Sequence, residues 1–220
     1  MIIGVTGLIG SGKDTIADYL CTHKGFKRIS FAASLKDAVA SVFGWDREML
    51  EGTTKSSRLW REQVDPWWSE RLNIPELTPR WVLQQWGTDV LRAGFHDDIW
   101  IASVENKLRS TTDDIVITDC RFPNEFKAIK NVSGITMRVV RGDQPEWYDA
   151  ALAYNRGPNG NSRWSLSKNK LDKLKVHASE YSSIGLNYDY TVDNNGTIDD
   201  LHNTISDIVN SQSQDLPASN

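Results

Sequence analysis

The residues with the clearest chemistry form a glycine-rich segment of the pattern GxxxxGK, Gly7-Leu8-Ile9-Gly10-Ser11-Gly12-Lys13. Glycine allows backbone conformations in which successive N–H groups point at phosphate oxygens, and the positive end of a following helix dipole strengthens such a site. Lys13 would reach the terminal phosphates as a flexible point charge. A strand-like run precedes the segment and a helical pattern follows it, which distinguishes a phosphate loop from a chance glycine turn. We therefore expect phosphate binding by Lys13 and by the loop residues Gly7, Gly10, Ser11 and Gly12.

The position after Lys13 departs from the general pattern of such loops. A Ser or Thr is usual there because its hydroxyl binds Mg2+, whereas this chain has Asp14 followed by Thr15. A carboxylate can hold Mg2+ directly or through water, and Thr15 can supply the missing hydroxyl. Alternatively, Asp14 only stabilises the helix N-terminus through its negative charge. The first interpretation makes Asp14 and Thr15 the predicted metal ligands.

A second set of polar residues follows the buried strand predicted over 114–118, in the sequence DCRFPNE. An acidic residue at the end of a strand next to the phosphate loop commonly works near the metal, which is the role predicted for Asp119. Arg121 can pair with a phosphate through two parallel hydrogen bonds. The alternative is a turn in which Asp119 and Arg121 pair with each other and Glu125 lies at a helix N-terminus. For Glu125 we expect either a ligand contact or this structural role.

A third set lies on a helix that begins at Pro79 and is predicted to end near Arg92. Arg80, Gln84 and Thr88 are spaced i, i+4, i+8, so a regular helix would place them on one face. Val82, Trp86 and Val90 have the same spacing on another face and are predicted to be core. A polar stripe of this kind can hold a phosphate and the edge of a base. A solvated helix face is the alternative.

The elements that must position these residues alternate along the chain. Short apolar segments predict strands over 1–6, 28–31, 114–118, 135–140 and 188–192. Helical patterns cover 13–23, 34–43, 79–92, 97–109, 123–132 and 197–209. Such alternation predicts an α/β fold of three layers with a central parallel sheet.

Two segments interrupt this alternation. Residues 44–78 are rich in tryptophan and charge and contain no strand pattern, which predicts a helical insertion. Residues 142–176 have a polar, glycine-containing centre followed by lysines, and we expect them to form a lid. The basic residues of this lid are Arg156, Arg163, Lys168, Lys170, Lys173 and Lys175. The prediction is a single domain over 1–211 and a polar tail over 212–220.

The composition excludes several classes of protein. Hydrophobic residues make up 39% and charged residues 25% of the 220, which is typical of a globular domain. The net charge of −4 argues against a duplex nucleic-acid partner, because such binding usually needs a basic surface. No apolar run approaches the roughly 20 residues of a membrane span. The two cysteines, Cys21 and Cys120, predict a reducing compartment, so we expect a cytoplasmic protein.

Together these motifs resemble the deoxynucleoside monophosphate kinases encoded by tailed phages, from Ile3 to about Leu201. That family also carries GKDT in its phosphate loop, as in Gly12-Lys13-Asp14-Thr15. Further matches are Leu35-Lys36-Asp37-Ala38, the RxxxQxxGTD pattern from Arg80 to Asp89, Trp100, the DxRxxxE pattern from Asp119 to Glu125, and His177-Ala178-Ser179-Glu180.

The resemblance implies a P-loop kinase fold and transfer of the γ-phosphoryl group of ATP, with Mg2+, to a deoxynucleoside 5′-monophosphate. It implies that Lys13 binds donor phosphates and that Arg80 and Arg121, with Lys36 as a further candidate, bind the acceptor phosphate or the transferring group. Gln84, Thr88 and Trp100 would contact the acceptor nucleoside, Trp100 by stacking or by an edge contact. Asp119 and Glu125 would bind metal through water, orient Arg121 or contact the acceptor sugar. A homodimer, and the host cytoplasm for a viral source, are expectations at the level of the family.

Three other functions fit the phosphate loop. A P-loop kinase can act on another small phosphorylated acceptor, such as dephospho-coenzyme A, because one fold hosts many acceptors. A nucleic-acid motor is disfavoured by the acidic net charge and the short chain. A binding module without catalysis does not account for Arg80, Asp119 and Arg121 together.

Overall fold

The computed structural model describes residues 1–109, 111–158 and 162–214. Part of the predicted lid, 159–161, and most of the predicted polar tail, 215–220, lie outside the described residues. The chain divides into two compact units. The sheet unit comprises Met1–Ile29 and the chain from Thr112 onward, and the helical unit comprises Ser30–Thr111. The helical unit contains the predicted insertion, 44–78.

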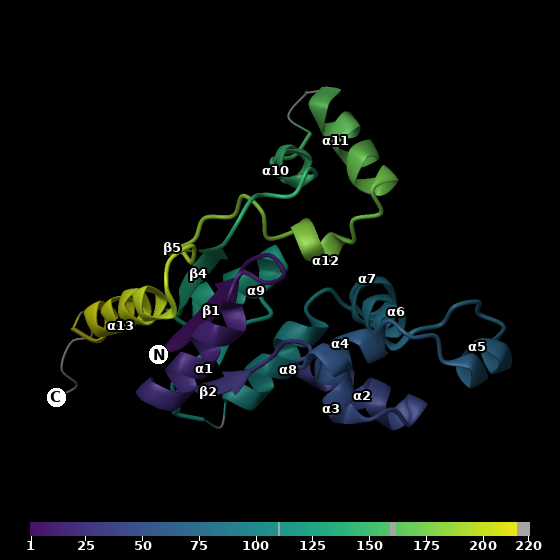
Figure 1. Cartoon of the computed structure of the whole chain (residues 1–220), viewed down its shortest axis with the longest axis horizontal. Helices are drawn as coiled ribbons and strands as arrows, with labels where there is room; N and C mark the ends of the chain where they lie inside the picture. The colour runs from purple at the N-terminus through teal and green to yellow at the C-terminus, as the bar shows by residue number, and fades with distance from the viewer. Residues whose placement is uncertain (110, 159–161, 215–220) are drawn as a thin grey trace. The chain divides into compact units, whose positions relative to one another are not determined.

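The sheet unit is built on five parallel strands in the order β2-β3-β1-β4-β5 (Figure 1). The strands are β1 (Ile2–Thr6), β2 (Lys27–Ile29), β3 (Ile115–Ile117), β4 (Ile135–Val140) and β5 (Tyr190–Asp193). They confirm the five predicted segments, with ends that differ by at most two residues. The central strand β1 pairs with β3 on one side and with β4 on the other. Its end, where Thr6 pairs with Arg138, is therefore flanked by the ends of two neighbouring strands.

Helices cover both faces of this sheet, which confirms the three predicted layers. On one face, Ile3 and Val5 of β1 pack with residues of α1 (Lys13–Lys24) and α13 (Ile198–Gln214) in the main core. On the other face, α9 (Pro123–Asn131) packs so closely that a Cβ on Gly4 would lie 2.2 Å from Cδ1 of Ile129. The strand alternation explains both contacts, because successive residues of β1 point to opposite faces.

Two helices in the predicted lid, 142–176, share a hydrophobic core with the segment that follows it. Helices α10 (Tyr148–Asn155), α11 (Ser162–Lys173) and α12 (Ala178–Tyr181) follow β4 in the chain (Figure 1). Ala151 and Leu171 are fully buried and form a cluster with Tyr181 and Ile184. This cluster is separate from the core around β1 and β4.

In the described residues of the helical unit, all regular elements are helices. They are α2 (Ala33–Phe43), α3 (Arg47–Glu51), α4 (Lys55–Arg61), α5 (Pro66–Leu72), α6 (Pro79–Gln84), the π-helix η1 (Gln85–Val90), α7 (Leu91–Gly94) and α8 (Ile99–Leu108). Phe43 contacts the rings of Trp45, Trp68 and Trp86 at centroid distances of 4.5, 4.7 and 5.4 Å. The indole N–H of Trp68 donates to the Phe43 carbonyl at 3.1 Å. Packing among aromatic rings therefore accounts for much of the tryptophan in this segment.

The predicted helix from Pro79 is interrupted by the π-helix η1. Its hydrogen bonds run from i to i+5, which shifts the residues after it relative to those before it. Val82 in α6 is 1% exposed as predicted, but Val90 at the end of η1 is 51% exposed. The prediction that Val90 belongs to the core was wrong because it assumed a regular helical period.

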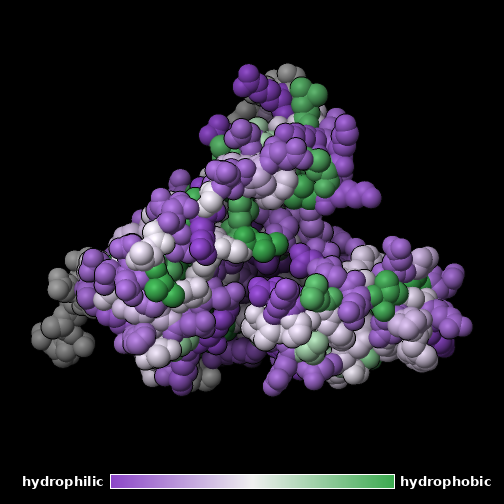
Figure 2. All heavy atoms as spheres, viewed as in Figure 1, coloured by the Kyte–Doolittle hydropathy of each residue, from purple (hydrophilic) through white to green (hydrophobic). Residues whose placement is uncertain are grey.

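The described surface carries its hydrophobic side chains in small, separate groups on the face seen in Figure 2. No helix of the described residues is long and apolar enough to cross a membrane.

The core on the α13 face allows a test of the packing. Ile205 is fully buried in the core, whereas Ile198, in the same helix, is 58% exposed. Replacing Ile205 with Ala removes buried methyl groups and leaves a cavity, so we expect a loss of about 2–5 kcal/mol in the free energy of unfolding. The control Ile198→Ala should change it by less than about 0.5 kcal/mol. Chemical denaturation measures both, and equal losses would contradict this packing.

Candidate active site

The phosphate loop lies between β1 and α1, and its backbone requires glycine. Gly10 and Gly12 have φ angles of +79° and +104°, in a region that other residues rarely adopt. A Cβ on Gly12 would lie 2.2 Å from Nδ2 of Asn194, which itself donates to the Ser11 carbonyl at 2.8 Å. The buried Asn194, which follows β5, thus supports the loop from the other side of β4. No local pattern in the sequence predicts this contact of Asn194.

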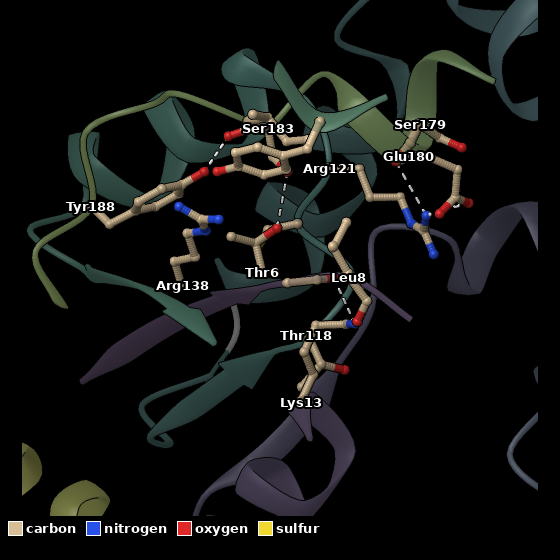
Figure 3. A pocket seen from close by; sticks show the side chains of 14 residues that line it. Thr6, Leu8, Lys13, Thr118, Arg121, Arg138, Ser179, Glu180, Ser183 and Tyr188 are labelled. Carbon is tan, nitrogen blue, oxygen red and sulfur yellow. Dashed lines mark hydrogen bonds and ion pairs between the residues drawn. The ribbon is translucent and has the colours of Figure 1, made fainter. Parts of the chain in front are cut away.

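Lys13 is the first residue of α1, and its side chain folds back over the loop. Its Nζ donates to the carbonyl oxygens of Gly7 and Leu8 at 2.8 and 2.9 Å (Figure 3). Burial lowers the pKa of Lys13 to about 8, and the positive charge of Arg121 adds to this shift. The negative charges of Asp14 and Glu180 act in the opposite direction. Lys13 is therefore an ammonium group at neutral pH, but one that loses its proton more easily than an exposed lysine.

Asp14 is exposed and forms an ion pair with Arg28 of β2. The same Arg28 nitrogen donates to Thr118 Oγ1 at 2.7 Å. Arg28 thus links the start of α1 to the end of β3 and restrains the Asp14 carboxylate. This role of Arg28 was not predicted, because a lone arginine in a three-residue strand carries no sequence signal of its own.

The residues at the start of α1 fit a metal ion that is held mainly by phosphates. No group of three or more His, Cys, Asp and Glu side chains in the described part of the chain could hold a metal ion. Mg2+ is usually bound by one or two carboxylates together with substrate phosphates and water. Asp14 bonds Arg28 through Oδ1, and it is followed directly by the hydroxyl of Thr15. This donor set suits Mg2+ that arrives with a nucleotide, and not an ion held by protein alone.

Arg121 follows β3 and is held from two sides. Its Nη1 donates to Glu180 Oε1 at 3.1 Å and to the Ser179 carbonyl at 3.2 Å, both in α12. Its backbone N–H donates to Glu125 Oε2 at 2.6 Å, and the same oxygen accepts from Phe122 N at 3.0 Å. Glu125 is 2% exposed. These bonds match two of the roles that the sequence left open for Glu125: the bond from Phe122 N caps the start of α9, and the bond from Arg121 N restrains the backbone of Arg121.

Lys13, Arg121 and Glu180 line one pocket of the sheet unit, with a volume of about 450 Å³ including its open mouth (Figure 3). Its walls carry three cations, Lys13, Arg121 and Arg138, against the single carboxylate of Glu180. Thr6 and Gly7, at the end of β1, also line the pocket. The pocket therefore has the charge to bind an anion. Asp119 is half-buried and lies between Thr118 and Cys120, which both line it.

The other predicted site residues lie in the helical unit, where charged residues are already paired. Lys36 contacts Glu51 at 2.5 Å, and Arg80 Nε lies 3.3 Å from Glu62 Oε1. Burial alone would raise the pKa of Glu51, but hydrogen bonds and charge from Lys36 and Arg47 lower it overall.

The polar stripe of the Pro79 helix extends across two elements. Gln84 lies in α6 and Thr88 in η1, and both side chains are half-buried. Trp100 is 7% exposed, and its indole N–H donates to the Gly87 carbonyl at 2.8 Å. Trp100 thereby holds the π turn that carries Thr88. Stacking on a nucleobase, as predicted for Trp100, would need an exposed ring face, which this burial does not provide.

Comparison with known proteins identifies the family. No family model matches the chain. A protein of Acanthamoeba polyphaga mimivirus, named as a deoxynucleotide monophosphate kinase, is 33% identical over 155 residues, covering 64% of this chain and 74% of the relative. The chain belongs to the deoxynucleoside monophosphate kinase family. The deoxynucleoside-5′-monophosphate kinase of Escherichia phage T5 is 25% identical over 186 residues, covering 62% of this chain and 74% of the relative.

Solved structures with a related arrangement include other kinases. Shikimate kinase from Aquifex aeolicus has 14% identity and a TM-score of 0.43, with 97% of this chain and 98% of that chain covered. Dephospho-CoA kinase from Campylobacter jejuni has 16% identity and a TM-score of 0.41, with 96% of each chain covered. These scores are low, and the fold of this deoxynucleoside monophosphate kinase family member rests on its own sheet and phosphate loop.

The pKa of Lys13 predicts how nucleotide affinity depends on pH. Phosphate binds the ammonium form and raises its pKa in the complex, so affinity stays level below about pH 8 and falls above it. Above this pH the affinity should fall by about tenfold per pH unit. Calorimetric titration of ATP with Mg2+ from about pH 7 to 10 measures it, and Lys13→Arg is the control because arginine keeps its charge throughout. A wild-type profile as level as that of Lys13→Arg would contradict the prediction.

Proposed function

We propose that this chain transfers the γ-phosphoryl group of ATP to a deoxynucleoside 5′-monophosphate. The observation that carries the proposal is its 33% identity with the mimivirus relative. The pocket at the end of β1 supports it, because Lys13 and Arg121 converge there beside a backbone suited to phosphates. An oxygen of the acceptor phosphate forms the new P–O bond, and the bond to the β–γ bridging oxygen breaks to release ADP.

The chain contributes position and charge to this reaction. Both substrates are anionic, so catalysis depends on holding them in line and neutralising the charge that develops between them. Lys13 and the N–H groups of the loop hold the donor phosphates. Arg121, oriented by Glu125 and Glu180, stabilises the acceptor phosphate or the transferring group. Bound Mg2+ neutralises phosphate charge, and Asp14 and Thr15 are its proposed protein ligands, with Asp119 acting through water.

The acceptor nucleoside is assigned to the helical unit on the resemblance to the family. Arg80 and Lys36 would bind its phosphate, and Gln84 and Thr88 would bind its base or sugar. Trp100 acts indirectly by holding the η1 turn through Gly87. Helices α10 and α11 form the proposed lid, which would exclude water as a competing acceptor.

An acceptor panel tests the function. ADP formation with ATP and Mg2+ is measured against the four deoxynucleoside monophosphates, their ribose counterparts, dephospho-coenzyme A and single-stranded DNA. Turnover with one or more deoxynucleotides is expected. Turnover with dephospho-coenzyme A alone would favour a P-loop kinase for another small phosphorylated acceptor. ADP formation stimulated by DNA alone would favour a nucleic-acid motor.

Arg80→Ala tests the acceptor side. Loss of its positive charge should raise the acceptor KM or lower kcat by about tenfold or more, while the Kd for ATP stays within about twofold. Arg80 is half-buried, and thermal unfolding verifies that the variant is folded. The matched control is Arg58→Ala in α4, where the arginine is exposed. Kinetics equal to those of Arg58→Ala would remove Arg80 from the acceptor site.

A further inference from the structure

We propose that Arg138 is a third phosphate-binding residue of the pocket, and that it holds an oxygen of a nucleotide phosphate from the β4 side. This inference rests on the proposed function for the source of the phosphate, but it depends on separate observations. They concern the position, the charge and the surroundings of this side chain.

The position of Arg138 follows from the sheet. Arg138 pairs in register with Thr6, the last residue of β1 before the phosphate loop. Arg121 follows β3 on the opposite side of β1. Figure 3 accordingly shows Arg121 and Arg138 on opposite sides of Thr6 and Leu8. The two guanidinium groups thus flank the phosphate loop within one pocket.

The charge of Arg138 is not neutralised by the protein. No carboxylate in the described part of the chain pairs with Arg138, whose guanidinium lies 5.2 Å from the ring centroid of Tyr148. Because Arg138 is only half-buried, its guanidinium remains accessible to an anionic ligand in the pocket. Glu180, the carboxylate that lines the pocket, is already bonded to Arg121. A contact with an aromatic face offsets only a small part of the charge.

The tyrosine next to Arg138 in the pocket is held by a hydrogen bond and is neutral. Tyr188 donates its hydroxyl to the Ser183 carbonyl, and Thr6 Oγ1 donates to Ser183 Oγ at 3.2 Å. Burial raises the pKa of Tyr188 to about 12, so its phenol is neutral at physiological pH. Tyr188 therefore carries no negative charge that would repel an anion bound to Arg138.

A second, smaller hollow of about 220 Å³ continues from Arg138 along the phosphate loop. Ser11, Arg141 and Gln144 also line it. Ser11 is 2% exposed, and its Oγ has no hydrogen-bond partner within the described residues. Buried hydroxyls are nearly always hydrogen-bonded, so this one points to a ligand atom. Two cations and a free hydroxyl beside a phosphate loop fit phosphate oxygens, which arginine binds through two parallel bonds.

The test replaces Arg138 with Gln, which removes the charge, and with Lys, which keeps it at a single point. The exposed Arg109→Gln is the matched control. The KM for ATP and the KM for the deoxynucleotide are measured separately, together with calorimetric Kd values for ATP, deoxynucleoside monophosphate and pyrophosphate, each added alone. We expect Arg138→Gln to weaken one nucleotide and pyrophosphate by about tenfold or more, with Arg138→Lys intermediate. Thermal unfolding verifies that the variants are folded.

The pattern of losses identifies the source. A loss confined to ATP assigns Arg138 to the donor phosphates, and a loss confined to the monophosphate assigns it to the acceptor; either supports the proposal. Affinities of folded Arg138→Gln and Arg138→Lys equal to those of Arg109→Gln would overturn it. If the wild-type protein phosphorylates no deoxynucleotide but binds pyrophosphate through Arg138, the proposed function fails while the phosphate site stands.

Discussion

The parallel pairing of β1 with a strand on each side is the constraint on which the site depends. Because all strands of the sheet point the same way, their carboxyl ends meet at one edge. This edge brings together the phosphate loop after β1, Arg121 after β3 and Arg138 near the end of β4. The hydrophobic contacts of Ile3, Val5 and Met137 with α1 and α13 fix this arrangement from one face. On the other face, Ile129 of α9 lies so close to Gly4 that β1 has no room for a side chain at this position.

Electrostatics then determines what this edge can do. Three cations share the pocket with one carboxylate, and that carboxylate is bonded to Arg121. Burial of the ammonium group lowers the pKa of Lys13 to about 8, and repulsion by the positive charge of Arg121 adds to this shift. A phosphate relieves this repulsion when it binds, so the site gains more from a dianion than an exposed cluster of the same residues would. The fold thus maintains an unfavourable concentration of positive charge at a place where a substrate can neutralise it.

The sequence was informative where residue type and spacing have a local physical meaning. The apolar runs located all five strands, and GxxxxGK located the phosphate loop, since both depend on neighbours in the chain. The π turn was not predictable, because Gly87 weakens a helix without indicating that an extra residue is inserted in the turn. The ligand contact predicted for Trp100 came from the resemblance to the family, whereas its bond to the Gly87 carbonyl was not predictable because a backbone carbonyl has no sequence signature. Arg28, Arg138 and Asn194 act across strands distant in sequence, and a single chain does not reveal such pairings.

The two bonds of Lys13 have a consequence for selectivity. Its ammonium group already donates to the carbonyls of Gly7 and Leu8, so a ligand that takes this group must compete with them. Binding is therefore an exchange of hydrogen bonds, and its net free energy is far smaller than that of the new bond alone. A hydrogen bond to a neutral ligand oxygen is no stronger than the bonds that Lys13 already makes to the carbonyls. A multiply charged oxyanion attracts the ammonium group more strongly than the two carbonyls do. The backbone carbonyls of the loop therefore make Lys13 selective for charged phosphates over neutral sugars and water.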